Sequence, residues 1–233
     1  GLIDFVSADL DEDGDMDLAI IDSRRALHVF SNERGGQFAA RPSPVSDPVN
    51  AVAISDINGD GRLDLVIRKG REFLRATDDT GKSWTIVELK CPYEAALPDA
   101  DITALLISDL DNNGSADIVN AGQVWQSRQD GDFVPLAKFQ DGELLSTKSI
   151  AIGTASDLNG DGRLDLVGLD AEGKPSALIN SGSENYGWQV IRPRSAKAEG
   201  DQRVNSFGIG GEMEIRSGLL AQKRVIDSPQ VHF

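Results

Sequence analysis

Residues 157–168 read DLNGDGRLDLVG, and residues 56–67 read DINGDGRLDLVI. The acidic part of this stretch occurs twice more with the same spacing, as DLDEDGDMD at 9–17 and DLDNNGSAD at 109–117. Each copy has oxygen-bearing side chains at positions 1, 3, 5 and 9, a glycine at position 6, and a short apolar run directly after it. One unit made of an acidic loop and a strand is therefore repeated along the chain.

This spacing of oxygen side chains allows each loop to fold around one hard cation. Calcium takes six to eight oxygen ligands in flexible geometry, whereas magnesium retains its waters and zinc prefers Cys and His ligands. The single Cys and the two His lie outside the loops. We therefore expect about four structural Ca²⁺ ions, one in each loop.

The expected ligands are four side chains and the position-7 carbonyl of each loop. They are Asp9, Asp11, Asp13, Asp17 and the Asp15 carbonyl; Asp56, Asn58, Asp60, Asp64 and the Arg62 carbonyl; Asp109, Asp111, Asn113, Asp117 and the Ser115 carbonyl; and Asp157, Asn159, Asp161, Asp165 and the Arg163 carbonyl. Gly14, Gly61, Gly114 and Gly162 occupy position 6, where the backbone must turn sharply.

Two other interpretations of the loops are weaker. An EF-hand carries a bidentate Glu at position 12 and lies between helices, but position 12 is Ile20, Ile67, Asn120 or Gly168, and the following residues are strand-like. A solvated polar turn would explain a single loop but is disfavoured by four copies. Clustered carboxylates also repel one another by a few kcal/mol per pair at an effective dielectric constant of about 20.

The fold class follows from the repeat. The loops begin at residues 9, 56, 109 and 157, a spacing of roughly 50 residues, which is typical of four-stranded propeller blades. In the second unit we expect strands at 49–55, 63–68, 72–76 and 83–89. An aromatic residue, Phe38, Trp84, Phe133 or Trp188, is expected to open each fourth strand as a packing anchor. Long helical periodicity is absent, so an all-β propeller is predicted.

The units resemble FG-GAP/VCBS repeats, the propeller repeats that also occur in integrin α subunits, and the resemblance covers about residues 1–183. It implies a propeller that commonly has seven blades, with one structural calcium between the first two strands of a blade. Because four units are present, we expect this segment to be part of a larger ring.

The remaining segment, 184–233, carries a second resemblance. WQVIRPR from Trp188, RVNSFGIGGEMEIRSG from Arg203 and RVIDSPQVHF from Arg224 are similar to the ASPIC/UnbV domain, which follows such repeats in the cartilage acidic protein family and bacterial relatives. The pattern usually continues with Gly-Leu-Gly after the final Phe, and a longer turn is shortened here to DSPQ. The resemblance therefore implies a small, incomplete β module.

Charge and composition restrict the partners. The formal charge is −15, from 23 Lys and Arg against 38 Asp and Glu, which disfavours nucleic acid and anionic membranes. No apolar stretch is long enough to insert into a bilayer.

The calcium loops and the cysteine count bear on location. Weak calcium loops fill where calcium is near millimolar, as outside the cell. With Cys91 as the single cysteine, an intramolecular disulfide is excluded, and an extracellular, cell-surface or periplasmic location is expected.

No catalytic motif is recognised. TGKS at 80–83 lacks the leading glycine of a phosphate loop, GIGGEM at 208–213 lacks the third glycine of a dinucleotide fingerprint, and His28 and His232 lie in strand-like segments. We expect a secreted module that binds a protein or a carbohydrate, as in cell adhesion. The alternative left open is a carbohydrate-active enzyme of the lyase or dehydratase type with its site on the propeller face opposite the calcium loops, because some propellers of the kind that the units resemble catalyse through residues on one face. Many carboxylate pairs are possible, and the sequence gives no separations between them.

Strand parity predicts where recognition would occur. Connections from first to second strands and from third to fourth strands emerge on one face of a propeller, and the other connections emerge on the opposite face. The calcium loops should share the first face. The opposite face would carry the segments 40–50 and 91–101, together with Arg24, Arg25, Arg71 and Tyr93, which could meet an acidic glycan or a protein loop.

Overall fold

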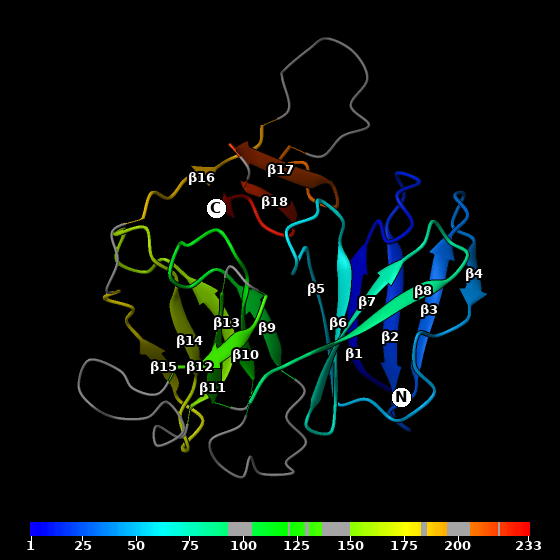
Figure 1. Cartoon of the computed structure of the whole chain (residues 1–233), viewed down its shortest axis with the longest axis horizontal. Helices are drawn as coiled ribbons and strands as arrows, with labels where there is room; N and C mark the ends of the chain where they lie inside the picture. Colours follow the sequence, from blue (N-terminus) through cyan, green and yellow to red (C-terminus); the bar gives the residue numbers. More distant parts are fainter. Residues whose placement is uncertain are drawn as a thin grey trace.

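The computed structural model describes residues 1–92, 104–120, 122–128, 131–136, 150–182, 186–194, 206–218 and 220–233. Four antiparallel sheets form the blades of a β-propeller (Figure 1), so the predicted all-β architecture is confirmed. The blades are β1–β4 (Leu2–Ala8, Asp17–Asp22, Leu27–Asn32, Phe38–Arg41), β5–β8 (Ala51–Ser55, Asp64–Lys69, Glu72–Asp78, Trp84–Leu89), β9–β12 (Leu105–Ser108, Asp117–Asn120, Gln123–Ser127, Phe133–Pro135) and β13–β15 (Ala151–Ser156, Asp165–Leu169, Pro175–Leu178). A larger ring stays a prediction.

Each blade is a meander of neighbouring strands, and its first strand is the innermost. The strand order in the sheets is sequential, and β1, β5, β9 and β13 all line one central cavity of about 780 Å³. Successive inner strands also contact one another, from β1 to β5, from β5 to β9 and from β9 to β13. The propeller therefore places the same position of each repeat at the same height around one axis.

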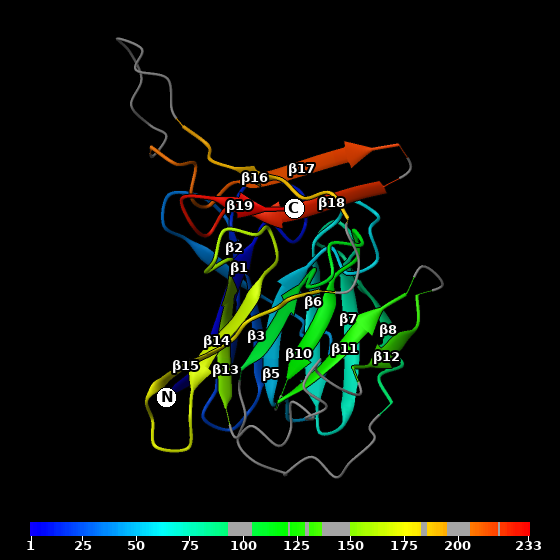
Figure 2. The same ribbon diagram turned by 90° about the vertical axis from the view of Figure 1, so that its left-hand side faces the viewer.

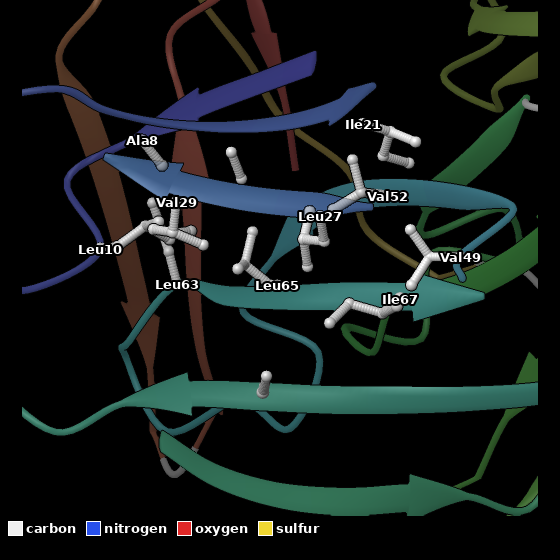
Figure 3. Close-up of a cluster of buried hydrophobic side chains, with 12 residues drawn as sticks. Ala8, Leu10, Ile21, Leu27, Val29, Val49, Val52, Leu63, Leu65 and Ile67 are labelled. Carbon is white, nitrogen blue, oxygen red and sulfur yellow. The ribbon is translucent and has the colours of Figure 1, made fainter. Parts of the chain in front are cut away.

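The hydrophobic core is divided between the seams of adjacent blades. In β6, Leu65 and Ile67 face the first blade, whereas Val66, between them, faces the third. Figure 3 shows the first of these seams, where side chains of β2 and β3 meet those of β6. The second and third blades are covered on both faces, so their second strands, β6 and β10, are buried along almost their whole length, and their nearly continuous apolar sequence is typical of such strands.

The second seam is built around the largest fully buried side chain of the described residues. Trp125 on β11 packs edge-on against Phe73 on β7, with ring centroids 5.3 Å apart. Its indole Nε1 donates a hydrogen bond to the carbonyl of Pro92 at 2.9 Å. A third cluster joins β10 and β11 to the fourth blade in the same way.

The fourth blade departs from the expected pattern. Phe38, Trp84 and Phe133 open the fourth strands β4, β8 and β12 as predicted. The prediction for Trp188 was wrong: within the described residues the fourth sheet has three strands, and Trp188 precedes β16 in the C-terminal segment. The Gln189 N–H donates to the carbonyl of Phe233 at 2.7 Å, which ties this segment to the end of the chain.

The C-terminal segment forms two small antiparallel pairs. They are β16 with β19 (Val190–Ile191 and Val231–His232) and β17 with β18 (Glu212–Ser217 and Leu220–Val225). These strands, which we call the C-terminal module, share a small core around Ile226 and Phe233. The module lies across the end of the propeller that carries the acidic loops (Figures 1 and 2). The part of the chain that the structure describes contains no helix long and apolar enough to span a bilayer.

Candidate metal centres on one rim of the propeller

All four acidic loops connect the first strand of a blade to its second strand. Loop 1 (9–17) joins β1 to β2, loop 2 (56–64) joins β5 to β6, loop 3 (109–117) joins β9 to β10, and loop 4 (157–165) joins β13 to β14. Because every first strand runs in the same direction along the propeller axis, the loops share one rim, as strand parity predicted (Figure 1).

The first aspartate of each loop organises the turn. In loop 1 the carboxylate of Asp9 accepts hydrogen bonds from the backbone N–H groups of Asp13 and Gly14, at 3.0 and 2.9 Å. The same pair of bonds recurs at the first aspartate of the other three loops. An aspartate that bonds its own following backbone closes a turn in this way, so the loop holds its shape through its own side chains.

Two backbone positions in each loop lie in the left-handed region. Position 6 is glycine throughout, with φ between 83° and 91°, as the sequence predicted. Position 4 is also left-handed, as Glu12 (φ 62°), Gly59, Asn112 (φ 58°) and Gly160. Position 4 was not among the predicted turn positions, although glycine in two of the four copies is the signal that could have indicated it.

The ninth position is buried in every loop and attaches the loop to the third strand of its blade. Asp17 accepts the N–H of Leu10 at 3.1 Å and that of Asn32, the last residue of β3, at 2.9 Å. Asp117 and Asp165 make the equivalent pairs of bonds. The exposed fraction of all four ninth-position aspartates is 1% or less. The residues that would bind metal are therefore also framework residues.

Loop 2 differs from the other loops at this position. Oδ1 of Asp64 accepts a hydrogen bond from the Thr77 hydroxyl, but its buried Oδ2 has no hydrogen-bond partner among the described residues. An unpaired carboxylate oxygen in the interior is costly unless a cation or a donor satisfies it. This orphaned oxygen fits a bound cation.

The residue at position 3 divides the loops into two pairs. In loops 1 and 3 the carboxylates at positions 1, 3 and 9 converge, with ligand oxygens of Asp9, Asp11 and Asp17 all within 4.8 Å of one another, and those of Asp109, Asp111 and Asp117 equally close. In loops 2 and 4, position 3 is Asn58 or Asn159, whose side-chain amide donates to the position-5 aspartate, Asp60 or Asp161, at 2.7 and 3.0 Å.

Positions 5 and 7 are held by a further repeated bond. The position-5 side chain, Asp13, Asp60, Asn113 or Asp161, accepts the N–H of position 7 in every loop. At position 7, the side chain of Asp15 pairs with Arg34, and the Arg62 guanidinium donates to the Asp78 carbonyl. Nothing in these contacts tests the expected role of the position-7 carbonyls, which stays a prediction.

Burial sets the electrostatics of the loops. It raises the pKa of Asp17 to about 6, that of Asp64 to about 6 and that of Asp117 to about 7. Burial, followed by the neighbouring charge of Asp13, also raises the pKa of Asp11. The charged form of each group is thus destabilised in the protein alone, and a divalent cation is the chemical group that would stabilise it. The donor set is all oxygen, which suits Ca²⁺.

An arginine that the sequence analysis did not identify lies beside loop 1. Arg41, at the end of β4, places Nη2 2.5 Å from Asp78 Oδ2 and Nη1 3.7 Å from Asp11 Oδ2, and its guanidinium lies over the Trp84 ring at 5.3 Å. Its side chain is only 9% exposed. Arg41 therefore supplies an internal positive charge between the first and second blades.

The C-terminal module, together with Trp188 just before it, packs against loops 2, 3 and 4 on the rim. The Trp188 ring lies against Gly162 of loop 4, and Leu220 lies against Gly114 of loop 3. The side chain of Gln222 reaches Asp109 at 3.4 Å, and the His232 ring reaches Asn112 at 3.4 Å. His232 thus belongs to a docking interface, whereas His28 pairs with Asp22 at the surface of the first blade.

The opposite face carries the predicted recognition residues. Arg24 and Arg25 lie in the turn between β2 and β3, and Arg71 lies in the turn between β6 and β7. The connection between the first two blades packs there, because Val49 N–H donates to the Arg25 carbonyl at 2.9 Å and Asn50 Oδ1 accepts the Gly70 N–H at 2.7 Å. Tyr93 and most of the segment 91–101 lie outside the described residues.

Comparison with protein-family models assigns the repeats. The FG-GAP-like repeat model matches residues 9–67 and 109–168, and the FG-GAP repeat model matches residues 49–86. The chain belongs to the FG-GAP repeat family. The matched ranges contain all four loops, so the family covers the whole candidate site. No curated protein matches the chain.

Several solved structures are similar to part of this chain. The Tc holotoxin pore of Photorhabdus luminescens is 20% identical with a TM-score of 0.48, over 74% of this chain and 9% of that chain. The complex of BBS1N with ARL6DN soaked with lead is 16% identical with a TM-score of 0.48, over 77% and 53%. The same complex soaked with mercury is 15% identical with a TM-score of 0.44, over 75% and 52%. The chain thus spans at most about half of these chains.

Proposed function

We propose that this FG-GAP propeller is a calcium-stabilised, extracytoplasmic module that binds another protein or a carbohydrate, as in cell adhesion. FG-GAP repeats generally bind calcium, are typically extracellular and commonly form binding modules. On this proposal each loop holds one Ca²⁺ through the ligands named above, and the metals are structural. The segment 184–233 is proposed to be an ASPIC/UnbV-like module.

The observation that carries the calcium part is the buried carboxylate geometry. Loops 1 and 3 each bring three carboxylates together, and within the part of the chain that the structure describes Asp11 Oδ1 and Asp64 Oδ2 are buried without a hydrogen-bond partner. Four bound Ca²⁺ would cancel about half of the formal charge of −15. Calcium would supply the positive charge that these oxygens lack, while the chain's own residues hold the loops in place through backbone hydrogen bonds.

The recognition part is supported by how the two faces differ. The C-terminal module occupies part of the rim with the metal loops, at loops 2, 3 and 4, which favours the opposite face as the one that meets a partner. Arg24 and Arg71 are exposed there on a strongly acidic protein. Exposed arginines bind carboxylate and sulfate groups through a planar pair of donors, which favours an acidic glycan or an acidic protein loop as the ligand.

Two measurements test this function. Isothermal titration with Ca²⁺ after removal of metal should give saturable binding, and the Asp157→Ala variant should bind fewer ions. Binding to immobilised polygalacturonate, alginate and heparin, with dextran as the neutral reference, should be lost in the Arg24→Gln/Arg71→Gln double variant. The matched control is Arg216→Gln, because Arg216 is exposed on the C-terminal module and pairs only with its neighbour Glu214 among the ion pairs of the described residues.

The outcomes separate the parts of the proposal. Equal binding by the double variant and the control would contradict the proposed recognition face. The absence of calcium uptake would contradict the proposed structural calcium sites. Turnover of any of these polysaccharides by the purified protein would favour a carbohydrate-active enzyme over a binding module.

A further inference from the structure

The C-terminal module contacts the metal loops at the glycines that close them. A Cβ atom at Gly162 would lie 1.9 Å from Cε2 of Trp188, and one at Gly114 would lie 2.6 Å from Cδ2 of Leu220. Both glycines are at position 6, with φ of 83° and 91°. The module therefore rests on bare backbone at the point where each loop turns around its ligands.

A third loop is touched in the same manner. The carbonyl of Ala221, next to Leu220 on β18, lies 3.6 Å from the position of a Cβ at Gly59, the fourth residue of loop 2. Gly59 has φ of 70°. The hairpin of β17 and β18 and the segment before β16 thus contact left-handed positions in loops 2, 3 and 4.

Polar contacts connect the module to the ligands themselves. Gln222 Nε2 donates to Oδ2 of Asp109, the first ligand of loop 3, at 3.4 Å. The His232 ring contacts the side chain of Asn112 at 3.4 Å and stacks on Trp188, with ring centroids 6.2 Å apart and an interplanar angle of 8°. Asn112 in turn donates from Nδ2 to the Gly162 carbonyl at 2.9 Å, which joins loops 3 and 4 under the module.

The hairpin also brings positive charge to the rim. Arg224 on β18 interacts electrostatically with Asp109, Asp56 and Asp117. Lys223 forms an ion pair with Glu212 at 2.6 Å and also interacts electrostatically with Asp9 and Glu12 of loop 1. These two cations cannot replace divalent ions at the ligand oxygens of all four loops. Their positive charge makes docking of the hairpin on the acidic rim more favourable than docking of a neutral hairpin would be.

We propose that Trp188 and Leu220, which lie outside the loops, are positioning residues for the metal sites, so that calcium binding and docking of the C-terminal module are coupled. This inference rests on the proposed calcium sites. In an empty loop, repulsion among the carboxylates opposes the backbone hydrogen bonds that hold the turn, and bound calcium removes that repulsion and so fixes the position of the glycine. Because coupling is reciprocal, a docked module must raise the calcium affinity of the loops by the same factor by which calcium favours docking.

The coupling extends to the central cavity. Lys223, Arg224 and Val225 line the same cavity as the inner strands of the four blades, and Val225 packs against the core of the first seam. The docked hairpin therefore forms one end of the cavity. Withdrawal of calcium releases the hairpin and opens the cavity at the rim.

The experiment measures calcium affinity in variants that change no ligand. Isothermal titration with Ca²⁺ is compared for the wild type, Trp188→Ala, Leu220→Ala and the control Arg216→Gln, whose side chain is 75% exposed. We expect affinity to fall by about fivefold or more in the first two variants, the lower end of typical coupling, and to stay unchanged in the control. Thermal unfolding in saturating calcium verifies that each variant is folded.

Hydrogen exchange provides the reciprocal measurement on the intact chain. Amides of β17 and β18 should exchange faster in EDTA than in calcium, whereas amides of β6 at the centre of the second blade should change least. Unchanged calcium affinity in both variants, or a hairpin equally protected with and without calcium, would overturn the coupling while leaving the calcium sites in place. A wild type that takes up no calcium would overturn the coupling and the proposed sites together.

Discussion

Arg41 provides the sharpest test of how the first two blades are held together. Its guanidinium is 2.5 Å from the carboxylate of Asp78, and the two side chains are 9% and 0% exposed. Replacing Arg41 by Met keeps the apolar stem but leaves Asp78 without its cation. Breaking a buried ion pair from one side costs about 3–5 kcal/mol, because the remaining charge is uncompensated. Loss of the contact with the Trp84 ring adds about 0.5–1 kcal/mol.

The double-mutant cycle isolates the pair. Asp78→Asn retains an acceptor for the N–H of Gly81, which is 2.9 Å from Asp78 Oδ1, and leaves Arg41 with Asp11 at 3.7 Å. We expect a cost of about 1.5–3 kcal/mol for this single change. The double variant Arg41→Met/Asp78→Asn should lose less than the sum of the two single variants, by about 2 kcal/mol or more.

The assay is equilibrium unfolding in urea, at saturating calcium and constant ionic strength, followed by far-UV circular dichroism. The matched control is Arg34→Met, because Arg34 also pairs with an aspartate but is 71% exposed, so its loss should cost about 0–1 kcal/mol. Two results would refute the reasoning: an Arg41→Met variant no less stable than the Arg34→Met variant, or single effects that add within about 0.5 kcal/mol.

Three further predictions follow from burial, close contacts and metal linkage. EDTA should lower the melting temperature, since calcium at 100 times its dissociation constant stabilises the folded protein by about 2.7 kcal/mol per site. Occupied sites would be contradicted by calorimetric curves that coincide with and without EDTA, or by curves that coincide for the wild type and Asp157→Ala in calcium. Burial raises the pKa of the Cys91 thiol to about 12, so at pH 8 the neutral thiol should resist a disulfide reagent in the native protein and react in urea, and rapid native labelling would disprove this. A Cβ at Gly168 would lie 2.1 Å from the Ala151 carbonyl oxygen, whereas one at Gly153 meets nothing within 4 Å; Gly168→Ala should therefore cost more than about 2 kcal/mol in urea unfolding and Gly153→Ala well under 1 kcal/mol, and equal costs would count against the observed strand pairing.

The loops and the strands that follow them could be predicted from the sequence because their signals are local. The spacing of Asp157, Asn159, Asp161 and Asp165 around Gly162 determines a turn without reference to the rest of the chain. The apolar run after it is long enough for a strand and too short for a helix. Repetition at roughly 50 residues then indicated blades, and alternation of connections placed the loops on one rim.

The features that were missed depend on contacts between distant parts of the chain. Arg41 meets Asp78 across a seam between blades, and nothing in the residues next to Arg41 indicates that partner. Trp188 follows a glycine just as Trp84 closely follows one, so the local pattern predicted the same strand position for both. The position of Trp188 is instead determined by Gly162 and His232, against which the ring packs.

The position-4 residues show a different kind of miss. Glu12 and Asn112 adopt the left-handed conformation that Gly59 and Gly160 adopt in the other two loops. Propensity alone does not predict this for a glutamate, because its Cβ disfavours that region by roughly 1 kcal/mol. Alignment of the four copies within this chain would have indicated it, since the turn must have the same backbone path in each.

The buried ninth aspartate has a consequence for how such repeats diverge. In loops 1, 3 and 4 it fastens the loop to the end of the third strand, or just beyond that end, through backbone donors that are present with or without an ion, and in loop 2 it does so through the Thr77 hydroxyl. A repeat that loses cation binding can replace the residues at positions 3 and 5 by other polar residues. Replacement of the aspartate at position 9 would instead detach the loop between the first two strands from the third strand of the blade. In repeats that have lost cation binding, the aspartate at position 9 should therefore be retained after the other acidic residues have been replaced. Its presence would then indicate where an ancestral cation site lay.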